Sequence, residues 1–132
     1  MKTLLKNNHS GLITTDNWEK KCWISIENPT SEERNYLLNE LQIPESFYND
    51  IEDIDERPRI EVENGWYLII LRIPYKNTDA KLPFTTVPLG IVFKDDVFVS
   101  ICFHETEMIH DFLFYTQRKN ILVKNNFDLV LK

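Results

Sequence analysis

The stretch of residues 44–61, PESFYNDIEDIDERPRIE, constrains the fold more than any other part of this sequence, because it fixes where a helix stops and a strand starts. Pro44 suits the first position of a helix, where its missing N–H group costs nothing. Pro58 pushes the preceding residue, Arg57, toward extended backbone, so the helix must end before Arg57. The sequence therefore predicts a short acidic helix that leads directly into a strand.

The predicted helix has an apolar face and an acidic face. Phe47, Ile51 and Ile54 recur at spacings of three and four residues, which predicts an apolar stripe with Asp50 at its margin. Asp53 lies one turn past Asp50, and like charges at this spacing repel by roughly the few tenths of a kcal/mol that a favourable pair contributes. A bound cation would turn this cost into a gain. Acid runs also occur as solvated faces that aid solubility, and the residues alone leave both interpretations open.

The size and charge of the chain bound its class. With 132 residues, of which 42% are hydrophobic, it has the length of one compact domain, which buries about two-thirds of the surface that the unfolded chain exposes. Twenty-one acidic against 15 basic residues give a formal net charge of −6, so the surface repels phosphate backbones and attracts cations. We therefore expect a single domain, residues 1–132, with no nucleic-acid partner.

The cysteines and the apolar runs indicate the compartment. Cys22 and Cys102 lie far apart inside apolar runs and form no CxxC pair, so they are expected to be core residues of a reducing compartment. The N-terminal MKTLLKNNH is too short in apolar character for a signal peptide, and no run approaches the roughly 18 apolar residues of a membrane span. The sequence as given predicts a soluble, cytosolic chain.

Short apolar and alternating runs predict a sheet. The residues expected to form strands are 12–15, 22–26, 59–63, 66–73, 85–94 and 97–104. The dipeptide Asn64-Gly65 predicts a tight hairpin whose second strand lies inside the sheet. Pro88 cannot donate a hydrogen bond to a neighbouring strand, which indicates an edge position or a bulge there.

Two further helices are predicted. Thr30 and Glu33 have the spacing of a capping box, and the apolar pattern after them predicts a helix over residues 30–43. After His104 the apolar period lengthens to that of another helix. The last residues begin a new apolar pattern that stops at Lys132, which predicts a chain cut within or just before a further helix.

Two arginines follow the acidic helix, and both are expected to fold back onto it. Arg57 and Arg59 lie close in sequence to several carboxylates. The predicted partners are Glu52, Asp53 and Asp55. Surface pairs of this kind are worth roughly 0–1 kcal/mol, so they position the strand and add little stability.

The sequence offers little for catalysis. Its three glycines, Gly11, Gly65 and Gly90, do not open a helix after a strand, so no phosphate loop is expected. His104 and His110 are six residues apart and face different sides of any helix, which argues against a zinc pair. The acids lie in one local cluster, whereas a Mg²⁺-dependent hydrolase usually draws its ligands from several separated segments. We expect no catalysis, and a stand-alone Mg²⁺-dependent hydrolase stays open as an alternative.

The order Asp-x-x-Asp-x-Asp-Glu-Arg-Pro-Arg-Ile-Glu, followed by an aromatic and aliphatic strand, resembles the N-terminal cytoplasmic domain of the CorA magnesium transporter family. In that family a helix carrying an Asp leads into an R-P-K/R-x-E segment and a strand of the central sheet. The matching residues here are Asp50, Arg57, Pro58, Arg59 and Glu61. The segments at 23–29 and 87–93 are also similar, and the likeness extends over nearly the whole chain.

The resemblance implies a fold and an assembly. It implies an α/β (α+β) domain with α/β/α layers around a mixed, largely antiparallel central sheet. Members of the family are homopentameric channels for Mg²⁺, and some relatives move Zn²⁺, Co²⁺ or Ni²⁺. The domain would lie on the cytoplasmic side of the inner membrane, as a fragment of a longer protein whose stalk helix and transmembrane helices are absent here. The implied partners are identical protomers, divalent cations and, through those later helices, the membrane.

The resemblance also implies a regulatory metal site. Asp50 matches the family's Asp that helps to bind divalent cations between neighbouring protomers. Some members carry an acid just before it, where this chain has Asn49, whose carbonyl can still hold an ion or a water. Asp53 is the third candidate ligand. Mg²⁺ keeps most of its waters, so one carboxylate per protomer gives the weak binding that suits a sensor.

The function implied by these residues is to sense intracellular divalent cations at protomer interfaces and so to gate the pore. The expected cofactor is a weakly bound regulatory Mg²⁺. This chain alone is expected to bind it poorly or not at all, because half of the site would come from the stalk helix. A related zinc transporter with the same fold is an alternative interpretation.

Overall fold

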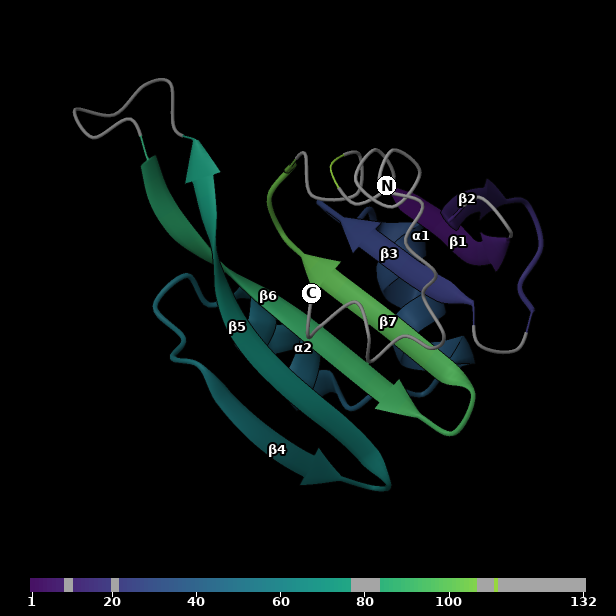
Figure 1. Cartoon of the computed structure of the whole chain (residues 1–132). Helices are drawn as coiled ribbons and strands as arrows, with labels where there is room; N and C mark the ends of the chain where they lie inside the picture. Colours follow the sequence, from purple (N-terminus) through teal and green to yellow (C-terminus); the bar gives the residue numbers. More distant parts are fainter. Residues whose placement is uncertain (9–10, 20–21, 77–83, 107–110, 112–132) are drawn as a thin grey trace.

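The computed structural model describes residues 1–8, 11–19, 22–76, 84–106 and 111 of the chain. Within these residues, seven strands form one sheet in the order β2-β1-β3-β7-β6-β5-β4 (Figure 1). The strands are β1 (Lys2–Asn8), β2 (Gly11–Thr15), β3 (Trp23–Glu27), β4 (Arg59–Glu63), β5 (Trp66–Lys76), β6 (Phe84–Lys94) and β7 (Val97–Cys102). All neighbouring pairs are antiparallel except β3 and β7. The sheet is mixed and largely antiparallel, which confirms the fold class expected from the sequence.

The parallel pair in the middle of the sheet shows how the chain is wound. After β3 the chain forms its helices and then the antiparallel series β4, β5, β6 and β7, which ends beside β3 with Ile24 opposite Val99. Parallel strands need a long connection of this kind, because a tight turn cannot join them. The acidic segment lies within this connection, where the last helix leads into β4.

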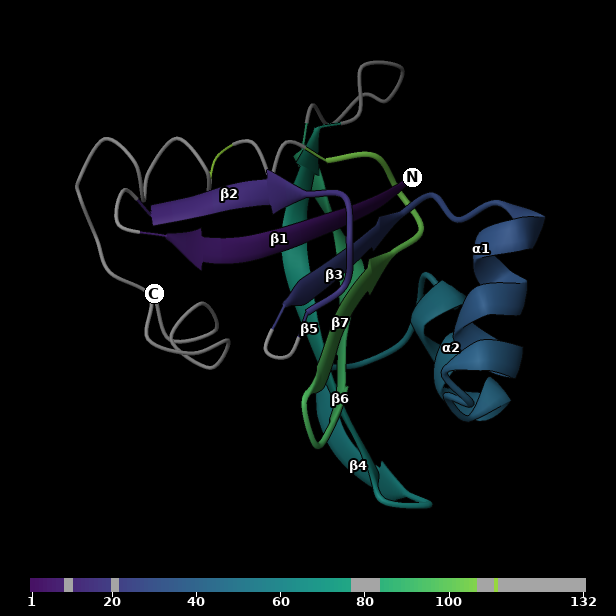
Figure 2. The same ribbon diagram turned by 90° about the vertical axis from the view of Figure 1, so that its right-hand side faces the viewer.

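The helices lie together on one face of the sheet (Figure 2). They are α1 (Ser31–Asn35), which continues into a π-helical turn, η1 (Tyr36–Glu40), and α2 (Glu45–Glu52). Thr30 Oγ1 accepts a hydrogen bond from the Glu33 N–H at 3.2 Å, and Glu33 Oε1 accepts one from the Thr30 N–H at 3.0 Å. This capping box confirms the predicted helix start. The helix expected after His104 lies outside the described residues.

The larger hydrophobic core lies between these helices and the sheet. Leu37 of η1 and the α2 residues Phe47 and Ile51 are almost completely buried in it. The sheet contributes Leu4, Ile24, Ile26, Trp66, Leu68, Ile70, Val92, Val99 and Ile101. Ile51 packs directly over Gly90 of β6, where a Cβ atom would lie only 2.2 Å from Ile51 Cδ1. The missing side chain of Gly90 therefore sets how closely α2 approaches the sheet.

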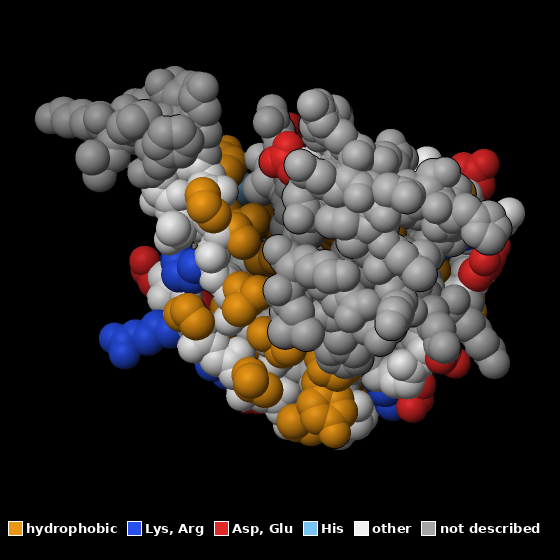
Figure 3. Space-filling view, viewed as in Figure 1, with side chains coloured by type: hydrophobic (Ala, Val, Ile, Leu, Met, Phe, Trp, Pro, Cys, Tyr) orange, Lys and Arg blue, Asp and Glu red, His pale blue; other side chains and the backbone are white. Residues whose placement is uncertain are grey.

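The opposite face of the sheet is also apolar. A second buried cluster lies there, formed by Leu5, Leu12, Trp23, Ile91 and Phe98. Figure 3 views this face and shows further hydrophobic side chains reaching its surface. Ile60 and Val62 of β4 stand opposite Ile69 and Tyr67 of β5, and Ile60 is 75% exposed. The sheet therefore has two apolar faces, and the β4 end of the second face is open to water.

Several local predictions are confirmed. Asn64 and Gly65 both have positive φ, as the predicted hairpin requires, and β5 lies inside the sheet between β4 and β6. Both cysteines are buried free thiols. Among the described residues, Pro88 of β6 pairs with Arg72 of β5, and the pairing of β6 with β7 begins two residues later, at Gly90. This confirms the prediction that Pro88 occupies a local edge position in the sheet.

The predicted apolar stripe of the acidic helix needs correction. Phe47 and Ile51 are buried as expected, but Ile54 is 46% exposed. The reason is that α2 ends at Glu52 and Asp53 already has extended backbone, so helical spacing no longer applies to Ile54. The buried side chain that completes the stripe is that of Tyr48.

Candidate functional site

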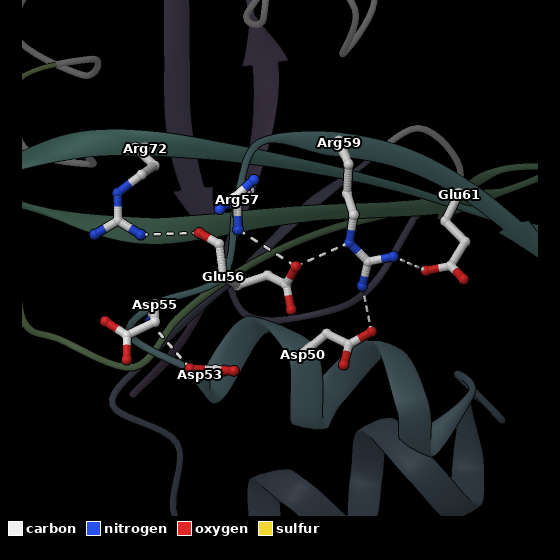
Figure 4. Close-up of polar contacts among 8 residues, drawn as sticks. All are labelled: Asp50, Asp53, Asp55, Glu56, Arg57, Arg59, Glu61 and Arg72. Carbon is white, nitrogen blue, oxygen red and sulfur yellow. Dashed lines mark hydrogen bonds and ion pairs between the residues drawn. The ribbon is translucent and has the colours of Figure 1, made fainter.

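A single arginine joins the acidic helix to the strand that follows it. Arg59 of β4 binds three carboxylates from three segments, which are Asp50 in α2, Glu56 in the loop and Glu61 in β4 (Figure 4). Arg59 Nε donates to Glu56 Oε1 at 3.1 Å. Nη2 donates to Asp50 Oδ2, and Nη1 donates to Glu61 Oε2. The side chains of Arg59 and Asp50 are 31% and 35% exposed, so this network is open to water.

The network raises the pKa of Arg59 above its ordinary value. Burial lowers the pKa of Arg59, but the hydrogen bonds to Asp50 and Glu61 and the nearby charges of Glu56 and Glu61 raise it. The net pKa lies above the ordinary value of arginine. Because arginine is protonated at physiological pH even without such partners, the guanidinium is a permanent positive charge beside Asp50.

The predicted fold-back of the arginines is only partly correct. Arg59 does return to the acidic segment, but its helix partner is Asp50. The expected partners Glu52, Asp53 and Asp55 make no described ion pair with it. Because the chain leaves the helix at Asp53, the side chains of Asp53 and Asp55 lie away from Arg59, while Glu56 further along the loop reaches it (Figure 4). The Arg57 side chain is exposed, and its backbone N–H donates to Glu56 Oε1 at 3.3 Å.

A second contact fixes α2 to β4. Ser46 Oγ donates to Glu63 Oε2 at 3.3 Å, one helical turn before Asp50. Ser46 and Asp50 thus face Glu63 and Arg59 in reverse chain order, so the helix and the strand run antiparallel. Two contacts one turn apart hold this face of the helix and fix the direction in which Asp50 points.

The three residues predicted to bind a metal have different surroundings. Asp50 uses Oδ2 to bind Arg59, and Oδ1 makes no hydrogen bond or ion pair with the described residues. Asp53 Oδ1 accepts from the Asp55 N–H at 3.0 Å, while Asn49 is exposed and its backbone carbonyl accepts from the Asp53 N–H at 3.2 Å. In the part of the chain that the structure describes, no group of three or more His, Cys, Asp or Glu side chains is arranged to hold a metal ion. A metal at Asp50 therefore needs ligands beyond these residues.

Arg72 of β5 holds the loop between α2 and β4. Its Nη1 donates to the backbone carbonyls of Ile54 and Glu56, each at 2.9 Å. Its Nε and Nη2 donate to Thr86 Oγ1 at 2.8 Å and to the Thr86 carbonyl at 2.7 Å. Arg72 is not among the residues that the sequence patterns indicate as functional. The available signal is that Arg72 is the one charged residue in the apolar run WYLIILRI, where a charge needs partners.

Replacing Arg72 is expected to loosen this loop and to lower stability. Arg72→Met keeps much of the side-chain length but removes all four hydrogen bonds. Hydrogen bonds to charged groups contribute about 1.5–3 kcal/mol when buried, and water replaces part of that here, so we expect a loss of about 2 kcal/mol in the free energy of unfolding. Urea denaturation measures this loss. Arg57→Met is the control, since the exposed Arg57 side chain has no described partner; an equal loss in both variants would contradict the anchoring role of Arg72.

Among the histidine and cysteine side chains, the structure describes those of His104, Cys22 and Cys102. His104 packs against the ring of Tyr75, with centroids 5.2 Å apart, and His110 lies outside the described residues. Burial raises the pKa of the Cys22 and Cys102 thiols, which keeps them protonated.

None of the helices in the described part of the chain has the length and apolar character needed to cross a membrane.

Comparison with known proteins identifies the family. The model of the CorA-like Mg²⁺ transporter protein family matches residues 18–132. No curated protein matches the chain significantly. The complete CorA magnesium transporter from Methanocaldococcus jannaschii aligns with 24% identity and a TM-score of 0.73, over 99% of this chain and 42% of that one. The soluble domain of CorA from the same organism aligns with 25% identity and a TM-score of 0.68, over 91% of this chain and 48% of that one.

A third solved structure shares the fold at low identity. The ZntB cytoplasmic domain from Vibrio parahaemolyticus aligns with 12% identity and a TM-score of 0.69, over 97% of this chain and 53% of that one. This chain spans less than half of the length of the two CorA structures. The family model covers α2, β4 and the ion-pair network between them. The chain belongs to the family of CorA-like Mg²⁺ transporter proteins.

Proposed function

We propose that this chain is the regulatory soluble domain of a CorA-like Mg²⁺ transporter and senses intracellular divalent cations where neighbouring protomers meet. The observation that carries the proposal is the position of Asp50. It lies on α2 in the segment that resembles the family, it is partly exposed, and its Oδ1 makes no hydrogen bond or ion pair with the described residues. A carboxylate oxygen so placed fits a hydrated Mg²⁺, which prefers oxygen ligands and keeps several waters.

Weak binding is what such a sensor requires. One carboxylate per protomer, with water as the other ligands, gives an affinity suited to an ion present near millimolar levels. Bound ions would screen the acids of facing protomers and favour the closed assembly. When intracellular Mg²⁺ falls, repulsion between those acids, added to the formal charge of −6 on each chain, would loosen the interfaces and open the pore.

The rest of the protein belongs to the same proposal. Residues 1–132 would form one domain on the cytoplasmic side of the inner membrane, followed by a stalk helix and membrane helices, in a homopentamer. The domain itself would catalyse nothing. Asn49 and Asp53 flank Asp50 on the exposed side of α2 and its end, where they would hold waters of the bound ion. Support for a longer protein comes from the complete CorA, of which this chain covers 42%.

A zinc transporter is the second candidate, because the chain shares its fold with the ZntB cytoplasmic domain. Zinc sites in proteins usually include Cys or His ligands. Here both cysteines are buried, and His104 packs on Tyr75. The oxygen of Asp50 is instead a hard ligand of the kind that Mg²⁺ selects. The chemistry around α2 therefore favours Mg²⁺ over Zn²⁺.

Ion flux into liposomes tests the proposed function. The full-length protein would be reconstituted in vesicles that contain a metal-sensitive dye. We expect Mg²⁺ flux that falls as Mg²⁺ rises into the millimolar range on the side of the soluble domain, and Co²⁺ and Ni²⁺ test the range of ions carried. Flux of Zn²⁺ alone would favour the second candidate. Absence of any divalent-cation flux, together with Mg²⁺-dependent hydrolysis of phosphate esters, would contradict both.

A further inference from the structure

The contact between Arg59 and Asp50 bears on how a cation reaches Asp50. Arg59 Nη2 donates to Asp50 Oδ2, which is one of the two oxygens available to a metal ion. A guanidinium and a divalent cation on the same carboxylate bring two positive centres within a few ångströms of each other, which is unfavourable. A cation that binds Asp50 must therefore either displace Arg59 or bind despite repulsion from the guanidinium.

Arg59 has other partners that hold it when it leaves Asp50. Glu56 Oε1 accepts from Nε at 3.1 Å, and Glu61 accepts from Nη1. Neither acid belongs to α2, so both stay with Arg59 if the helix contact breaks. Release of Asp50 then breaks one of three contacts and leaves the guanidinium paired. The exchange avoids the large cost of an unpaired buried charge.

The other arginines of this region do not compete for Asp50. The Arg57 side chain is exposed, and Arg72 is bound to backbone carbonyls and to Thr86. Among the described residues, Arg59 is the cationic group that contacts Asp50. The guanidinium of Arg59 and a cation from solution therefore compete for the carboxylate of Asp50.

We propose that Arg59 is a built-in competitor for the cation at Asp50 and that it raises the Mg²⁺ concentration at which the domain responds. This inference rests on the proposed function. At low Mg²⁺, Arg59 occupies Asp50 and ties α2 to β4. At high Mg²⁺, the ion takes the carboxylate, and Arg59 stays on Glu56 and Glu61.

The test is the Mg²⁺ concentration that half-closes the channel, measured by flux from liposomes containing the full-length protein. Arg59→Gln removes the competing charge, so this concentration is expected to fall by about two- to fivefold, the range of a partly exposed ion pair. Arg57→Gln is the matched control. It removes the same charge at a position two residues from Arg59, and the exposed side chain of Arg57 has no described partner. Its shift is expected to be clearly smaller. In an Asp50→Ala background, Arg59→Gln is expected to have no further effect.

Each outcome decides between the alternatives. An unchanged half-closing concentration in Arg59→Gln, with the circular dichroism spectrum of the parent, would overturn the inference and leave the proposed function standing. Equal shifts in Arg57→Gln and Arg59→Gln would also overturn it, because general charge would then explain both. Arg59→Lys covers the case in which the glutamine variant does not fold: it keeps the charge without the forked geometry, and it should lie between Arg59→Gln and the parent. No shift in that variant would count against the inference. The proposed function fails separately if Asp50→Ala closes at the concentration of the parent.

Discussion

Gly90→Ala is expected to lower the free energy of unfolding by about 3 kcal/mol, at the upper end of the usual cost of overpacking a core. The added Cβ would lie 2.2 Å from Cδ1, 2.4 Å from Cγ1 and 3.2 Å from Cγ2 of Ile51. Ile51 is 1% exposed and cannot turn into solvent. Either α2 moves away from the sheet or β6 shifts, and both changes disturb a closely packed interior.

A double-mutant cycle with Ile51 identifies the cause of this loss. Ile51→Ala alone is expected to cost about 2–5 kcal/mol, because it leaves a cavity. In the double variant the methyl group introduced by Gly90→Ala occupies part of that cavity, so the combined loss should be smaller than the sum of the single losses by about 1 kcal/mol or more. Urea denaturation of the three variants and the parent measures the coupling. Additive losses would contradict the close approach of α2 to Gly90.

Gly65→Ala is the control, because Gly65 lies in the turn between β4 and β5 and not under a packed side chain of α2. Gly65 has a φ of +82° in the hairpin, and its Cβ would meet the flexible end of Lys94 at 3.3 Å. The expected cost is therefore mainly backbone strain, about 1–2 kcal/mol. If Gly65→Ala lowers the free energy of unfolding as much as Gly90→Ala does, the contact with Ile51 is not the main cause of the loss in Gly90→Ala.

The position of Gly90 also matters for the candidate site. Ile51 is the residue next to Asp50, so the packing of Ile51 against Gly90 helps to set the distance between Asp50 and β4. Arg59 and Glu63 then fix the same helix from its polar side. Packing and polar contacts thus hold α2 in the same position. The residues that provide them, Gly90 and Arg59, lie 31 positions apart in the sequence.

Short-range signals in the sequence predict much of the fold. The hairpin at Asn64 and Gly65 and the capping box at Thr30 depend on residues a few positions apart, and both are confirmed. Strand β1 is not expected from the sequence, because Leu4 and Leu5 are adjacent and do not alternate. In the structure Leu4 faces the helices and Leu5 faces the opposite side of the sheet, and both are buried. A strand buried on both faces loses the alternation that identifies strands.

The candidate site shows the same limit. The sequence places acids and arginines in one segment, but which acid meets Arg59 depends on where α2 ends and how β4 passes it. The role of Arg72 depends on contacts with Ile54, Glu56 and Thr86, which lie 14 to 18 residues away. Contacts of this range follow from tertiary packing, and no local pattern of residues specifies them.

Asp50→Ala is expected to have the largest effect on function. It removes the carboxylate that is proposed to hold the regulatory ion, and loss of even an outer-shell partner typically lowers metal affinity about 10–100-fold. The Mg²⁺ concentration that half-closes the channel should therefore rise by at least about tenfold. Stability should change little, since a partly exposed ion pair with Arg59 contributes only about 0–1 kcal/mol. Glu52→Ala is the control, because Glu52 is an exposed acid at the end of the same helix whose side chain makes no described hydrogen bond or ion pair.

Whether Asp50 senses the regulatory ion is tested by a titration of Mg²⁺ flux in liposomes that contain the full-length parent, Asp50→Ala or Glu52→Ala. We expect the parent and Glu52→Ala to close at similar Mg²⁺ concentrations and Asp50→Ala to need at least about ten times more Mg²⁺ to close. Closure of a correctly folded Asp50→Ala protein at the concentration of the parent would contradict the claim that this carboxylate senses the ion.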